Sequence, residues 1–360
     1  MKLEVVNAIY TIIIWQSFLF GVLLFTPKYN KVSGNKFLAF NLLGIGVQFI
    51  INSLFINNYI NQLPLNICSY GYLYGPLLFF YVKFTLRKEV VFRGIDFLHF
   101  SPFVSITLFS VFNIDVCNIM ADLLLPTMFV YFTLTLRDII IYKKTIPQVS
   151  TNIGRSEINW LLILLIVSIL NVIISLIYEN LTPNITFFGN TIRLSFFVII
   201  GVLLFVNLII FQGLKNPKFF QQISSEDIDI AKSAIPLNIA KSNFSNIEQL
   251  EALSNKLEDH MNTNRVFMDA ELNLSSLAEI LNVHPKTLSQ SINNIFESNF
   301  SDYINSYRID ASKKLLIESD TSIKEIMFEV GFNSRSVFNT LFKKRTGLTP
   351  SQYRDKHTNS

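Results

Sequence analysis

The stretch that decides the fold of the C-terminal part is SIKEIMFEVGFNSRSVF, residues 322–338. Apolar residues recur on both sides of Gly331 at the three- and four-residue spacing of an amphipathic helix. They are Ile323, Ile326, Met327 and Val330 before the glycine, and Val337, Phe338, Leu341 and Phe342 after it. Glycine readily adopts the left-handed backbone that a tight turn requires. The pattern predicts two short helices that pack across a turn at Gly331-Phe332, in a unit of about residues 321–346.

The same arrangement occurs upstream, at about residues 271–296. Its apolar residues fall at helical spacing on either side of the break Asn282-Val283-His284. They are Leu272, Leu277, Ala278, Leu281, Val283, Leu288, Ile292, Ile295 and Phe296. Pro285 suits the first position of the second helix, where a backbone N–H is not needed. Because residues 300–318 form a further helical stretch, the sequence predicts two helix-turn-helix units joined by a helix.

Polar and basic side chains occupy the exposed positions of the second helix in each unit. Such side chains hydrogen-bond to base edges, and lysine and arginine attract phosphates. The expected DNA contacts are Lys286, Thr287, Gln290, Ser291, Asn294, Asn333, Arg335, Ser336, Asn339, Thr340, Lys343, Lys344 and Arg354. The net charge of +4 is too small to indicate nucleic acid by itself, so the local clustering carries this argument. The alternative is an inert helical bundle whose basic residues form a solvated face.

Two further runs extend the pattern, FKKRTGLTPSQYR at 342–354 and FSDYINSYR at 300–308. Together with residues 322–338 they resemble the AraC/XylS family over about residues 262–356. The resemblance implies a seven-helix domain that places two recognition helices in successive major grooves of double-stranded DNA. Gln290 and Thr340 stand where the family often carries arginine, and Glu297 stands where a turn glycine is common. These departures bear on the target sequence and affinity more than on the fold.

The first part of the chain has a different composition, since 50% of the whole chain is hydrophobic and these residues crowd before about Gln212. Roughly 17 to 25 apolar residues cross the hydrocarbon core of a bilayer. Seven spans are predicted: Val5 to Phe25, Phe37 to Ile56, Cys68 to Phe84, Phe97 to Phe112, Ile119 to Leu136, Trp160 to Tyr178 and Leu194 to Phe211. The runs YGPLLFFYVK at 74–83 and QGLKNP at 212–217 resemble bacterial regulators that join such a module to this DNA-binding domain.

The predicted fold class is all-α, with a seven-transmembrane bundle followed by a cytoplasmic domain with two helix-turn-helix units. The expected domains are a membrane domain at 1–214, a linker at 215–246 and a DNA-binding domain at 247–360. Lysine and arginine gather in alternate connections, for example at Arg87, Lys143 and Lys144. The positive-inside rule therefore places the N-terminus outside and the C-terminus in the cytoplasm of a bacterial inner membrane.

A few polar residues of the membrane part are candidates for special roles. Asp122 and Arg193 are a candidate ligand-binding ion pair, and the alternative places both at the interface among headgroups. Cys68 and Cys117 face the oxidising side as a candidate disulfide, with two free thiols as the alternative. Gln48, Asn52, Asn171 and Asn207 are expected to bridge helices. Neither the cysteines nor the four scattered histidines have metal-ligand spacing.

The sequence predicts a one-component transcription regulator anchored in the lipid bilayer, which binds DNA and responds to a small-molecule or membrane signal. No phosphate loop, nucleophile motif or metal cluster is recognised, so an enzyme is not expected, and no cofactor is implied. A homodimer is expected only because two linked sites raise affinity for DNA. The alternative function is a seven-span receptor or transporter whose cytoplasmic tail binds protein.

Overall fold

The structure is a computed structural model that describes residues 3–358, apart from 28, 30–32, 60–67, 113, 115, 152–154, 181–183, 188–189, 194, 216–221 and 234–243. The chain forms two compact units. The first comprises Met1–Ile140 and Asn159–Gln222, and the second comprises Ile141–Ile158 and Ile223–Ser360. The predicted domain limits at residues 214 and 246 stay predictions.

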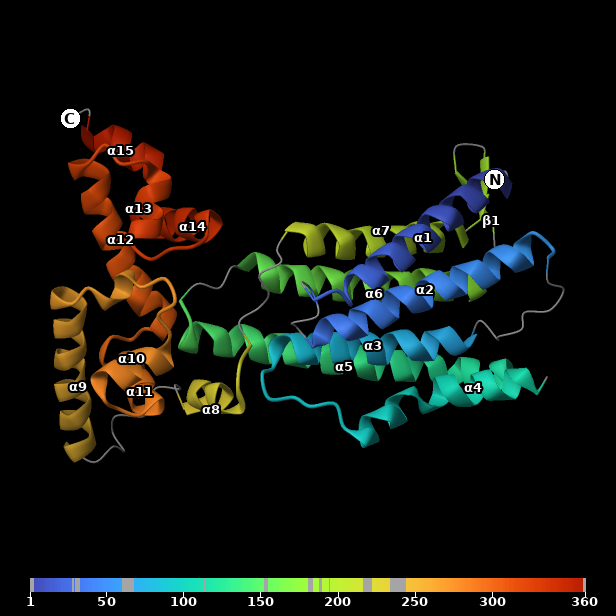
Figure 1. The fold of residues 1–360 in the computed structure, drawn as a ribbon, viewed down its shortest axis with the longest axis horizontal. Helices are drawn as coiled ribbons and strands as arrows, with labels where there is room; N and C mark the ends of the chain where they lie inside the picture. Colours follow the sequence, from blue (N-terminus) through green and yellow to red (C-terminus); the bar gives the residue numbers. More distant parts are fainter. Residues whose placement is uncertain are drawn as a thin grey trace. The chain divides into compact units, whose positions relative to one another are not determined.

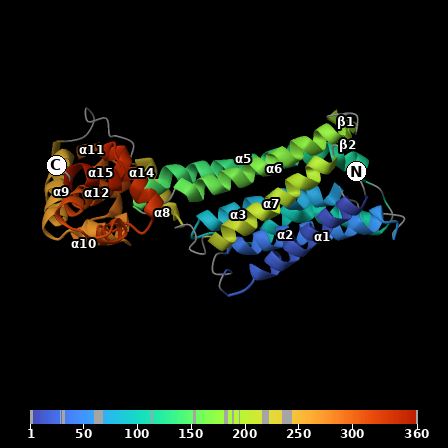
Figure 2. The same ribbon diagram turned by 90° about the horizontal axis from the view of Figure 1, so that it is seen from above.

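The first unit consists mainly of long apolar helices (Figure 1). Its elements are α1 Leu3–Leu23, α2 Gly34–Ile56, α3 Cys68–Leu86, the 3-10 helix η1 Gly94–Phe100, α4 Ser101–Val111, most of α5 Cys117–Val149, most of α6 Arg155–Asn180, and α7 Ser195–Lys215. Helix α1 packs against both α2 and α7, and α2 packs against α3 (Figure 2). A small antiparallel hairpin, β1 Asn184–Phe187 with β2 Asn190–Arg193, adds strand to an otherwise helical chain.

Four helices of the described chain, not the predicted seven, are long and apolar enough to cross a membrane by length and composition. They are Glu4–Leu23, Gly34–Ile56, Asp122–Val149 and Ile158–Ser175, with a shorter apolar helix at Phe197–Phe211. The predicted span from Phe97 to Phe112 is wrong as a single helix. It divides into η1 and the 11-residue α4, which at about 1.5 Å per residue is only about half as long as the hydrocarbon core is thick.

Helix α3 also falls outside the four membrane-length helices. Its sequence carries four tyrosines together with Gly75 and Pro76, which lower its hydropathy. Helix α5 is longer than expected, with 33 residues, so Lys143 and Lys144 lie within a helix and not in a connecting loop. The assignment of the N-terminus to the outside therefore rests on the charge pattern alone.

Polar side chains join several of these helices. The hydroxyl of Tyr74 on α3 donates to Oε1 of Gln48 on α2 at 2.6 Å. The amides of Asn207 on α7 and Gln16 on α1 pair at 3.2 and 3.4 Å. The expected bridging role is thus confirmed for Gln48 and Asn207. Asn171 instead donates to Val167 O within its own helix at 3.1 Å, which is the geometry of an i−4 backbone bond.

The second unit contains the helices of the C-terminal domain. They are α8 Ser225–Ser233, α9 Phe244–Thr263, η3 Val266–Met268, α10 Leu274–Leu281, α11 Pro285–Ile295, α12 Phe300–Glu318, α13 Ile323–Glu329, α14 Arg335–Thr346 and α15 Pro350–Thr358. The two predicted helix-turn-helix units are confirmed as α10 with α11 and as α13 with α14. The predicted connecting helix at 300–318 is α12.

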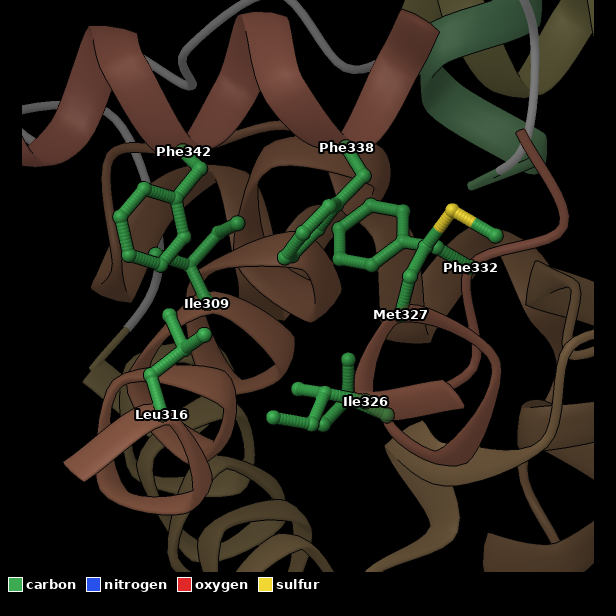
Figure 3. Packing of buried hydrophobic residues seen from close by; sticks show 8 residues of the cluster. Ile309, Leu316, Ile326, Met327, Phe332, Phe338 and Phe342 are labelled. Carbon is green, nitrogen blue, oxygen red and sulfur yellow. The ribbon is translucent and has the colours of Figure 1, made fainter. Parts of the chain in front are cut away.

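The core of the second helix-turn-helix unit is made by the apolar residues that the periodicity selects (Figure 3). Its buried members are Ile309, Leu316, Ile326, Met327, Val330, Phe332, Phe338 and Phe342. The aromatic rings of Phe332, Phe338 and Phe342 follow one another at centroid distances of 5.3 and 5.6 Å. Burying an aromatic or aliphatic side chain of this size stabilises the fold by about 1.5–3 kcal/mol. This core fixes α14 against α12 and α13.

Side-chain caps set where the short helices begin. Ser322 accepts a hydrogen bond from Glu325 N at 3.2 Å, and the Glu325 carboxylate accepts from Ser322 N at 3.1 Å. Hydrogen bonds from Ser322 hold the pKa of Glu325 below its ordinary value. Asn273 caps α10 in the same way, by accepting from Ser276 N at 3.0 Å. A mostly polar sequence thereby specifies two helix starts in the domain.

Candidate nucleic-acid interface

Left-handed residues set the geometry of both helix-turn-helix turns. Asn282 ends α10 with φ 54°, and Gly331 follows α13 with φ 91°. A Cβ at Gly331 would also lie 2.8 Å from Met268 O and 2.9 Å from Phe267 O. The prediction that this turn needs a glycine is therefore confirmed for two reasons, backbone conformation and close approach.

The second recognition helix, α14, presents the richest set of exposed candidates. Exposed along it or just before it are Asn333, Arg335, Ser336, Thr340, Lys343 and Lys344, and Asn339 is half-buried. Arg335 stands at the first position of the helix, and the two lysines lie in its last turn. Within the described residues no ion pair is found for these three cations. They are available to phosphates or base edges.

The first recognition helix, α11, presents fewer exposed candidates for DNA contacts. Lys286 and Thr287 are exposed, and Gln290 and Asn294 are half-buried. The expectation that Ser291 is exposed is wrong, because its side chain is buried and its Oγ donates to Leu250 O on α9 at 3.0 Å. Ser291 lies where helix α9 packs against α11. The sequence pattern missed this because a serine looks exposed by composition alone.

Arg354 is engaged inside the domain. Its guanidinium donates to Leu316 O at 3.1 Å and to Thr321 O at 2.6 Å, which ties α15 to the end of α12. The predicted DNA contact at this residue would have to share the guanidinium with these carbonyls. Arg345, which is not among the predicted DNA contacts, is exposed and pairs with Asp310 at 3.0 Å.

Arg308 on α12 makes a network of buried hydrogen bonds inside the C-terminal domain. It is fully buried, and it donates from Nε to Phe267 O at 2.7 Å and from Nη2 to Asp269 O at 2.7 Å. Its guanidinium carbon lies 5.5 Å from the centre of the Phe332 ring. Burial lowers the pKa of Arg308 to about 10, against an opposing effect of Asp269, so it remains protonated at neutral pH. The Arg308 side chain thus connects the segment before α10 with the turn of the second helix-turn-helix unit.

Residues 148–151 at the end of α5 contact this domain. Arg308 Nη1 donates to Thr151 Oγ1 at 3.0 Å, and Asn305 Nδ2 donates to Thr151 O at 3.2 Å. Asn293 on α11 donates to Gln148 Oε1 at 3.2 Å. Ser150 forms an isolated backbone bridge with Asn273. The α5–α6 connection is therefore bonded to the helix-turn-helix domain within one compact unit.

A second segment reaches the start of α11. Helix α8 packs against α11, and its Glu226 carboxylate lies 3.8 Å from His284 Nε2. His284 is the residue that caps α11, since its Nδ1 accepts from Lys286 N at 3.2 Å. An acidic side chain therefore stands beside the N-terminus of the first recognition helix, where a phosphate would otherwise be favoured.

Glu297 follows α11 in a left-handed conformation, with φ 47°. This backbone costs a residue with a Cβ roughly 1–2 kcal/mol. Glu297→Gly is therefore expected to raise the free energy of unfolding of the domain by about 0.5–1 kcal/mol, because glycine's larger unfolded-state entropy offsets part of the relief. Denaturant unfolding measures the change. Glu297→Ala is the matched control and should give no gain, and an equal gain from alanine would contradict strain at this position.

Two of the predicted sites in the first unit are not tested. Asp122 is exposed, but the side chain of Arg193 lies outside the described residues. The side chains of Cys68 and Cys117 also lie outside them. The ion pair and the disulfide stay predictions. Among the described residues, no group of three or more His, Cys, Asp and Glu side chains is placed to hold a metal ion.

The geometry is that of a domain with two helix-turn-helix units joined by one helix, and residues 277–356 match the family described as Helix-turn-helix domain. AdaA of Bacillus subtilis (strain 168), a bifunctional transcriptional activator/DNA repair enzyme, is 31% identical over 159 residues, and the match covers 39% of this chain and 75% of AdaA. The uncharacterized transcriptional regulatory protein YesN from the same strain is 36% identical over 80 residues, 22% of each chain. The C-terminal domain of AraT, a response regulator from Geobacillus stearothermophilus, is 32% identical with a TM-score of 0.27, over 29% of this chain and 85% of that one.

The chain is a transcription regulator with a DNA-binding helix-turn-helix domain. More particularly, it belongs to the AraC family of transcriptional regulators. It spans less than a quarter of the length of YesN, so the similarity to that protein concerns the DNA-binding domain alone. The family match at residues 277–356 lies entirely within the second unit.

Proposed function

We propose that this chain is a membrane-anchored one-component regulator, which binds promoter DNA through both helix-turn-helix units under the control of a signal received by its apolar helices. The observation that carries the proposal is the joining, in one chain, of four helices of membrane length with an AraC-type domain. The proposed site of the first unit is a bacterial inner membrane, with the C-terminal domain in the cytoplasm. The DNA contacts are those predicted from the sequence, without Ser291.

The surface of the first unit supports membrane anchoring. Large apolar side chains lie exposed along the outer faces of its helices, among them Trp15 at 72% exposure, Phe129 at 71% and Phe211 at 62%. Soluble monomers rarely expose contiguous apolar surface beyond a few hundred Å². The hydrocarbon of a bilayer would cover such side chains without cost.

The contacts of residues 148–151 support control of DNA binding. Helix α5 is continuous from Cys117 to Val149, and directly after it Thr151 bonds to Arg308. Gln148 and Glu226 touch opposite ends of α11, at Asn293 and His284. A movement of the α5–α6 connection would change these bonds and the support of the first recognition helix. Such a change would bias the domain between two arrangements.

The similarity to AdaA leaves the absence of enzyme activity as a prediction, since the name of that relative includes a DNA repair enzyme. The homodimer also stays a prediction. It rests on the gain in affinity from two linked domains and on no contact between copies.

The test is genome-wide DNA occupancy of the full-length protein, together with its distribution between membrane and soluble fractions. We expect the protein in the membrane fraction, with discrete peaks that disappear in the double variant Arg335→Ala, Lys343→Ala. The matched control is Lys232→Ala, Lys314→Ala, which removes two lysines outside the helix-turn-helix units and should keep the peaks. Recovery in the soluble fraction would overturn membrane anchoring. Identical regulation by residues 223–360 alone would overturn control by the first unit.

A further inference from the structure

A cavity of about 130 Å³ lies among the helices of the first unit. Helices α2, α3, α5, α6 and α7 all contribute to its wall, which is mainly apolar. Its polar members are Asn41, Gln48, Tyr74, Ser168 and Asn171. Each of the described residues that line it is uncharged, and burying an ion without a partner is costly, so a charged occupant is disfavoured.

Three side chains at the cavity donate hydrogen bonds within the bundle. Tyr74 donates to Gln48, Ser168 Oγ donates to Leu164 O at 2.8 Å, and Asn171 Nδ2 donates to Val167 O. Two amide oxygens are left over. Neither Asn41 Oδ1 nor Asn171 Oδ1 has a hydrogen-bond partner among the described residues. The cavity therefore offers two unpaired acceptors.

The two unpaired oxygens are built into the bundle. The side chain of Asn41 is almost fully buried, at 3% exposure. The Asn171 amide lies against Gly201 of α7, where an added Cβ would overlap Asn171 Oδ1. An unsatisfied buried polar group costs about 1–3 kcal/mol, so two of them beside one cavity call for a partner that the chain does not provide.

We propose that this cavity binds a small uncharged aromatic molecule that carries an O–H or N–H donor, of the class of phenols and indoles. A cavity of about 150 Å³ with apolar walls accepts a benzene ring, which sets the size. The donor pairs with Asn41 Oδ1 or Asn171 Oδ1, while the ring lies against Ile45, Leu78 and Phe132. A lipid acyl chain fits this site less well because it has no donor. That occupancy alters DNA binding rests on the proposed function, whereas the binding itself does not.

The test uses full-length protein in lipid nanodiscs, with phenol and toluene as probes of similar size that differ in the donor. Calorimetric titration should show saturable binding of one phenol per chain, at least about tenfold tighter than toluene. Asn41→Leu should remove this preference. The matched control is Asn207→Leu, which changes an exposed amide on α7 that does not line the cavity. This variant should keep the preference for phenol over toluene.

Val172→Phe narrows the cavity without changing an amide, and it should weaken phenol and toluene alike. This variant keeps the test decisive if Asn41→Leu fails to fold. Absence of saturable phenol binding overturns the site, and equal binding of phenol and toluene overturns the role of the oxygens. Saturable binding with unchanged DNA occupancy would leave the site standing and contradict the signalling part of the proposed function. Membrane-dependent regulation without phenol binding would overturn the cavity site and leave the signalling part of the proposed function standing.

Discussion

Arg308→Met is expected to lower the free energy of unfolding of the C-terminal domain by about 3–5 kcal/mol, a large share of the 5–15 kcal/mol typical of a whole domain. The substitution leaves two carbonyls, Phe267 O and Asp269 O, without the charged donor that both now contact at 2.7 Å. It also removes the cation beside the Phe332 ring. Hydrogen exchange of the α12 amides in the full-length protein measures the loss as faster exchange.

Two substitutions separate the buried network from a simple effect of charge. Arg345→Met removes an exposed arginine whose partner is Asp310, so the expected loss is at most about 1 kcal/mol. Arg308→Lys keeps the charge but not the planar donors of a guanidinium, and it should behave almost like methionine. Exchange of α12 that is unchanged in Arg308→Met would show that the carbonyls find other partners and that Arg308 does not organise the domain.

The C-terminal domain could be predicted closely from the sequence because its signals are local. The break at residues 282–284, Pro285 at the start of α11 and Gly331 in the second turn all specify backbone geometry within a few residues. The apolar periodicity selected the residues of the core shown in Figure 3. The burial of Arg308 is also predictable from the sequence, since it lies four residues after Ile304 on the buried face of α12. A charged residue at a core-facing position predicts a buried network.

The first unit was harder to predict because its contacts are long-range. Gln16 and Asn207 are separated by 191 residues, and no periodicity connects them. Hydropathy alone also cannot distinguish a helix that spans a bilayer from a short one such as α4 that packs at its side. The unpaired oxygen of Asn41 depends on which helices surround it. The rule that amides in apolar helices bridge to a neighbouring helix is right for Gln48, which bonds to Tyr74. It is wrong for Asn171, which donates to a carbonyl of its own helix.

Alanine substitutions along α14 are expected to separate affinity from sequence preference in DNA binding. Arg335 begins the helix, and the N-terminal residues of a recognition helix reach base edges. Lys343 and Lys344 lie in the last turn, where the backbone of the duplex is the nearer partner. Arg335→Ala should therefore weaken binding to the preferred site by roughly 10- to 100-fold and to unrelated DNA far less. Lys343→Ala, Lys344→Ala should weaken both equally.

The salt dependence of binding checks this division. Each lost phosphate contact makes the negative slope of log K against log salt concentration less steep by about 0.9. The slope of the double lysine variant should therefore be less steep by close to ~2. Fluorescence anisotropy of labelled duplexes between about 50 and 200 mM salt covers the useful range. Lys314→Ala, an exposed lysine on α12, serves as the control and should leave the slope unchanged. An unchanged slope in the double lysine variant would mean that the basic end of α14 is a solvated surface, and that the phosphates are bound from elsewhere in the domain.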